Sequence, residues 1–142
     1  MGLYLRAGMK RFKNIISLSF LLLISSVYGE DSSVFFIKPS NGDVVDKTFE
    51  VVFGINGMTL APAGTYDNDT GHHHLIIDAQ LPDLSMPVPA TKQYLHFGKA
   101  QDRTMITLEP GKHTLQMILG DGNHIPHNPP IYSEIIEIEV KP

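Results

Sequence analysis

Hydrophobic and polar residues alternate with a period of two along most of the chain beyond residue 33, which is the pattern of β-strands that bury one face. In the segment 48–55, Phe49, Val51 and Phe53 share one face, and the segment 113–120 repeats the pattern. Clusters of Gly, Pro, Asn and Asp separate the runs. The pattern predicts seven strands, at 34–38, 48–55, 72–79, 93–98, 103–109, 113–120 and 133–140. No stretch carries an apolar face at helical spacing.

Seven short strands in a region of this length indicate an all-β fold. We expect an immunoglobulin-like antiparallel β-sandwich of about seven strands, with a small barrel as the alternative. Residues 30–142 are long enough to form a single domain with one core. Three irregular segments, 57–71, 81–91 and 121–132, are of the length that often carries function.

The first 29 residues have the organisation of a signal peptide. Arg6, Lys10, Arg11 and Lys13 precede an apolar stretch at 15–26, and the small residues Val27 and Gly29 follow it. We expect cleavage after Gly29, with an uncleaved N-terminal anchor as the alternative. No later segment is apolar for long enough to cross a bilayer. The sequence therefore predicts a periplasmic or secreted protein.

Charge and cysteine content narrow the partners further. All fifteen acidic residues but only seven of the eleven basic ones lie beyond residue 29, which gives that region a formal charge of −8. This charge argues against a nucleic-acid partner, because nucleic-acid binding needs a basic surface. The absence of cysteine excludes disulfides and thiolate metal ligands. Histidine, methionine and carboxylates remain as metal donors.

Three of the seven histidines are consecutive, at the start of the third predicted strand. Alternation places His72 and His74 on one face and His73 on the other, in phase with Leu75 and Ile77 and toward the core. His113 opens the sixth predicted strand, in phase with its apolar residues. We expect His96 to hydrogen-bond a loop carbonyl.

Two more histidines, His124 and His127, follow the end of the sixth strand. That end is roughly 20 Å from His113, so a compact site can include either His113 or this loop, not both. Imidazole is a common ligand of copper and zinc. The predicted metal ligands are His72, His73, His74, His124 and His127, with Asp69 or Asp121 orienting the rings or adding an oxygen. Protons should weaken binding as the pH falls through ~6.5.

Two other classes of function stay open. The first is a structural or protein-interaction module of the cell envelope, with another envelope protein as partner and the histidines in a hydrogen-bond network. The second is an enzyme, which the sequence disfavours. It has no cysteine, no GxSxG motif and no serine beside a base. Beyond copper or zinc, no cofactor is expected.

Five motifs, in this order, resemble a bacterial exported domain family known as domain of unknown function 4399: GMTLAPAG, GHHHLIID, YLHFGKAQ, LEPGKHTLQMILGD and HIPHNPP. The resemblance covers about residues 34–140. It implies an exported single-domain bacterial protein and supplies no activity, ligand or catalytic residue. Lys99 and Ala100 depart from the small or glycine-rich residues expected there. The motif positions are His72, His73, His74, His96, Gly98, His113, Asp121, His124, His127, Pro129 and Pro130.

Overall fold

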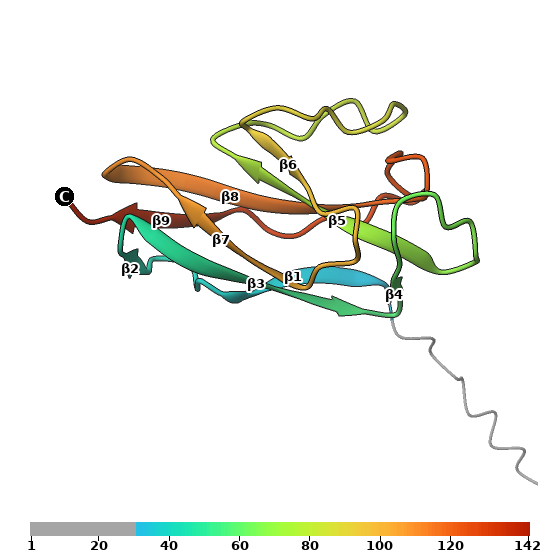
Figure 1. Cartoon of the computed structure of the whole chain (residues 1–142), viewed down its shortest axis with the longest axis horizontal. Helices are drawn as coiled ribbons and strands as arrows, with labels where there is room; N and C mark the ends of the chain where they lie inside the picture. Colours follow the sequence, from blue (N-terminus) through green and yellow to red (C-terminus); the bar gives the residue numbers. More distant parts are fainter. Residues whose placement is uncertain (1–30) are drawn as a thin grey trace, which may run out of the picture.

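The computed structural model describes residues 31–142, which form nine strands in two sheets (Figure 1). The smaller sheet contains β1 (Ser33–Lys38), β3 (Thr48–Asn56) and β7 (Arg103–Thr107), in the order β1-β3-β7. Both pairings are antiparallel. This sheet supplies one wall of the core.

The larger sheet has six strands, ordered β2-β9-β8-β5-β4, with β6 also paired to β5. The long members, β5 (Thr70–Ile77) and β8 (Gly111–Gly120), pair antiparallel over six register positions. β9 (Ile136–Val140) pairs antiparallel with β8, and β6 (Tyr94–His96) pairs antiparallel with β5. The two-residue strands β2 (Val44–Val45) and β4 (Thr59–Leu60) pair parallel with β9 and β5.

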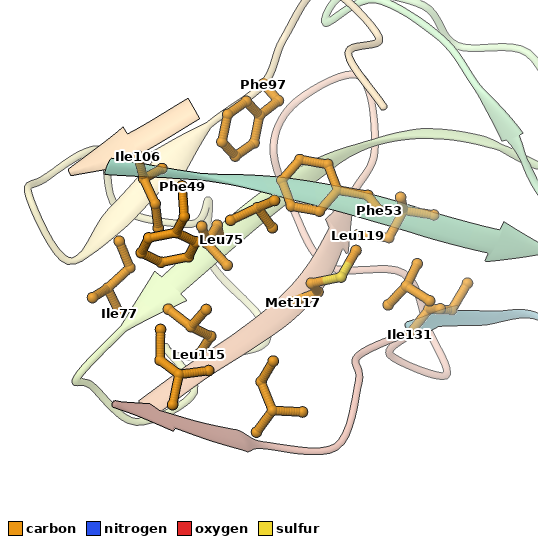
Figure 2. Close-up of a cluster of buried hydrophobic side chains, with 14 of the residues drawn as sticks. Phe49, Phe53, Leu75, Ile77, Phe97, Ile106, Leu115, Met117, Leu119 and Ile131 are labelled. Carbon is orange, nitrogen blue, oxygen red and sulfur yellow. The ribbon is translucent and has the colours of Figure 1, made fainter. Parts of the chain in front are cut away.

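The main core lies between the two sheets, where side chains from both point toward one another (Figure 2). Phe49, Val51 and Phe53 of β3 are buried at alternate positions, as their period-two spacing predicts. Leu115, Met117 and Leu119 of β8 are fully buried on the facing sheet. The alternation seen in the sequence therefore identifies the inward faces.

A second, smaller cluster covers the opposite face of β5. Ile76 and Ile118 pack there against Val88 of the long segment between β5 and β6. In Figure 1 this segment arches over the larger sheet on the side away from β1 and β3. Consequently Gly71 to Ile77 of β5 are buried whichever way their side chains point.

The all-β class is confirmed, and each predicted strand overlaps an observed one. The expectation of antiparallel pairing holds for the long strands. It fails for β2 and β4, each of which pairs parallel with its neighbour over two residues. Such short strands have no alternation to detect. The immunoglobulin-like topology stays a prediction. The predicted signal peptide lies outside the described residues, and within 31–142 no helix could span a bilayer.

Candidate metal centre

The outer face of β5 places two imidazoles side by side. His72 and His74 are two residues apart on one strand, so both point away from the main core. Their Nε2 atoms are 3.1 Å apart, and the side chains are 0% and 1% exposed. Two imidazole nitrogens on one tetrahedral zinc ion would be separated by about 3.3 Å. The pair is therefore spaced either for one N–H···N hydrogen bond or for a shared ion.

The neighbouring strand β6 adds a third imidazole. His96 lies directly opposite His74 in the antiparallel ladder. Its ring centroid is 5.0 Å from that of His72 and 5.1 Å from that of His74. One nitrogen from each of the three rings lies within 4.8 Å of the others. His96 is exposed, so this set reaches the surface.

Two glycines leave room for these rings. A Cβ on Gly98 would collide with the imidazole of His96, two residues before it. A Cβ on Gly120 would lie 2.9 Å from Nε2 of His74. Gly120 faces His72 across the β5–β8 ladder. At both positions a larger residue would require a histidine ring to move.

A fourth ring approaches from the loop after β8. The His124 centroid is 4.6 Å from that of His96 and 5.0 Å from that of His72. Asp121 organises this loop, because its Oδ1 accepts hydrogen bonds from the amides of Asn123 (2.8 Å) and Ile125 (2.9 Å). His124 has a left-handed backbone with φ of 68°. Its nitrogens do not join the set of three donor atoms.

Burial keeps the paired rings neutral. It lowers the pKa of His72 to about 4, with His96 and His124 acting in the same direction. Burial likewise lowers the pKa of His74 to about 3, with help from His72 and His96. For His72 and His74, therefore, protons should compete with a metal only below the pH of ~6.5 expected from the sequence.

The second nitrogens of the buried pair lack partners. Nδ1 of His72 and Nδ1 of His74 are buried without a hydrogen bond to any described residue. A buried polar atom left without a partner costs about 1–3 kcal/mol. The two buried imidazoles therefore lower the stability of the fold, and their presence calls for a reason other than stability.

The other predicted ligands lie elsewhere. His73 points into the main core, where its centroid is 4.9 Å from that of Phe53. His127 contacts Gly71 and lies near Asp69 and Asp121. Burial lowers the pKa of His127 and outweighs the two carboxylates, which act to raise it. Metal binding by the five predicted histidines stays a prediction. Of these five, the structure brings together His72, His74 and the ring of His124. It adds His96, which the sequence did not predict as a ligand.

His113 is distant from this group, because it lies near the start of β8, whereas His72 pairs with Gly120 at the end of that strand. Its Nδ1 bonds Asp78 Oδ2 (2.6 Å), and its Nε2 bonds the carbonyl of Glu109 (2.8 Å). The sequence offered little signal for His96. Its position beside His74 depends on the register of β6 against β5, two strands that the 78–93 segment separates in the sequence.

The donor set suits a transition metal. Three neutral imidazoles can bind copper or zinc, whereas magnesium and calcium prefer oxygen ligands. No carboxylate belongs to the set of donors found among residues 31–142. The residues present therefore fit zinc, a divalent ion of intermediate softness, or copper.

Comparisons with known proteins give a family but no activity. Among curated proteins no relative matches the chain. One solved structure, "X-ray structure of the endo-beta-1,4-mannanase from Thermotoga petrophila", is similar at 16% identity and a TM-score of 0.43. That similarity covers 80% of this chain and only 21% of the mannanase chain. The model of the domain of unknown function DUF4399 matches residues 51–141, so the chain belongs to that family.

Proposed function

We propose that this protein binds one transition-metal ion, copper or zinc, through His72, His74 and His96. The observation that carries the proposal is the convergence of three imidazole nitrogens within 4.8 Å, two of them from buried rings. Burial and mutual repulsion hold those two rings neutral, which is the form that binds a metal.

The alternative is a structural module with the histidines in a hydrogen-bond network, and it has less support. Within the described region one hydrogen bond, between His72 and His74, joins the clustered rings. The Nδ1 atoms of these two residues lack partners there, whereas a stabilising network would satisfy them.

We also propose that the protein works outside the cytoplasm, in the periplasm or after secretion. The support is the signal-like pattern of residues 1–29 and the choice of nitrogen donors in a chain without cysteine. Mass spectrometry of the protein in periplasmic and cytosolic fractions would test this: a chain beginning at Glu30 is expected in the periplasm, and a chain with intact Met1 found in the cytosol would contradict it.

Metal content and metal-dependent melting of the untagged protein test the central proposal. We expect one equivalent of copper or zinc and a melting temperature that rises by several degrees with saturating metal, since binding to the folded state stabilises it. His96→Ala removes an exposed ligand and should weaken binding by more than about 100-fold, beyond the loss typical for outer-shell partners.

His113→Gln is the matched control: His113 lies on β8, bonded to Asp78 just beyond the far end of β5, so its replacement should leave metal affinity unchanged. A protein that binds neither metal, or a His96→Ala variant with unaltered affinity, would contradict the three-histidine site.

A further inference from the structure

The three proposed ligands differ sharply in their access to solvent. His72 and His74 are buried by the sheet and by the loops over it, whereas His96 is exposed on a three-residue strand. An ion held by all three would lie at the boundary between the sheet and the solvent. One side of such an ion would face outward.

The ring of His124 lies beside the exposed member of the set, His96, with centroids 4.6 Å apart, and its backbone is held from two directions. Its amide donates to the carbonyl of Asp121 (2.9 Å), and its carbonyl accepts from the amide of Val88 (2.9 Å). Its ring is close to His72 and His96, but its nitrogens do not converge with the three donor atoms. The loop thus fixes an imidazole near the proposed ion without making it a ligand.

The charge of the donor set also matters. Three neutral imidazoles leave a divalent ion with its full positive charge. Asp121 is the acid whose charge acts on His72, and its Oδ1 already accepts two backbone hydrogen bonds. An anionic ligand from solution would compensate the charge that the protein leaves unbalanced.

We propose that the metal keeps one coordination position for a small exogenous ligand, either water, hydroxide or a small anion. We further propose that His124 is the hydrogen-bond partner of that ligand. This inference rests on the proposed metal site. Three protein ligands plus an open position distinguish reactive metal sites from structural ones, which four protein ligands close.

Azide titration of the Cu(II)-loaded, untagged protein tests the open position. Azide bound to Cu(II) gives a ligand-to-metal charge-transfer band and changes the electron paramagnetic resonance spectrum. We expect one azide per copper. His124→Gly, which suits the left-handed backbone at this position, should keep copper affinity within about tenfold and weaken azide binding about five- to tenfold, equivalent to one lost hydrogen bond of ~1 kcal/mol.

His127→Ala is the control within the same loop and should bind azide as the wild type does. Stoichiometric copper without an azide band would overturn the open position. Loss of copper by His124→Gly to the extent seen in His96→Ala would also overturn it, because His124 would then be a fourth ligand. A wild-type protein that binds neither copper nor zinc fails before azide is added, and that result rejects the metal site itself.

Discussion

His73 lies between the two sheets with both ring nitrogens buried and without a hydrogen bond to any described residue. Burial lowers its pKa to about 4, so the ring is neutral at physiological pH. The two ring nitrogens of His73 therefore lower the stability of the fold, because each loses its hydrogen bonds to water and gains none in the protein. Alternation along β5 makes this cost unavoidable for a run of three histidines, because the middle one must point inward.

Replacing His73 by Leu should therefore stabilise the protein by about 1–3 kcal/mol, by removing the unsatisfied polar atoms. Metal affinity should not change, because the ring lies on the opposite face of β5 from His72 and His74. Urea unfolding with chelator present and a metal titration would measure the two effects.

The same substitution at His113 is the control. Both of its nitrogens are bonded, so His113→Leu should destabilise the protein. A His73→Leu variant less stable than the wild type would show that the ring makes a contribution that its contacts do not reveal.

At the scale of elements, the sequence predicted the faces of β5 but not its neighbours. Period two assigns His72 and His74 to one face without knowledge of the fold. The partner of His74 depends on the pairing of β5 with β6 across a 16-residue connection, from 78 to 93, and no local pattern encodes that register. The sequence therefore predicts neither the place of His96 in the site nor the cover that the 78–93 segment gives to the outer face.

The loop after β8 provides a prediction at this scale. Asp121→Ala removes two hydrogen bonds to backbone amides and should cost about 1–2 kcal/mol. Hydrogen exchange should then show lost protection at Asn123 and Ile125, because local opening becomes easier.

Asp83→Ala is a matched control, since Asp83 accepts bonds from the amide and hydroxyl of Ser85 in a separate loop. Its effect should stay within that loop. Unchanged exchange at Asn123 and Ile125 in Asp121→Ala would mean that other contacts hold the loop.

At the scale of the whole molecule, the histidines beside the two ends of β5 have pKa values shifted in opposite directions: those of His72 and His74 of β5 are lowered, whereas that of His113 of β8 is raised. Beyond Ile77, Asp78 accepts from the amide of Thr114 and bonds the ring of His113. Partial burial acts to lower the pKa of His113, but its bonds to Asp78 and to the Glu109 carbonyl outweigh that effect and raise it.

A histidine with a raised pKa in the folded state stabilises the fold at low pH. Its contribution is fully present below the unfolded pKa of about 6.5 and is lost as the pH rises through the higher folded pKa. Near pH 6 we expect the unfolding free energy of the wild type to exceed that of His113→Gln by about 1 kcal/mol, a small value because Asp78 is half-exposed and solvent screens the pair. At pH 9, where the His113 ring has lost its proton, the difference should be smaller. Denaturant titrations at the two pH values measure this; a difference that grows with pH would contradict it.

The position of His72 and His74 on β5 also has a consequence for exchange of the proposed metal ion. β5 is bonded to β8 and β6 on its two sides over His74, so its backbone opens only when much of the larger sheet does. The exposed side chain of His96 can instead change rotamer while every strand stays paired. Release of the ion would then require no opening of the sheet, so dilute urea, which promotes such opening, would leave the dissociation rate unaltered.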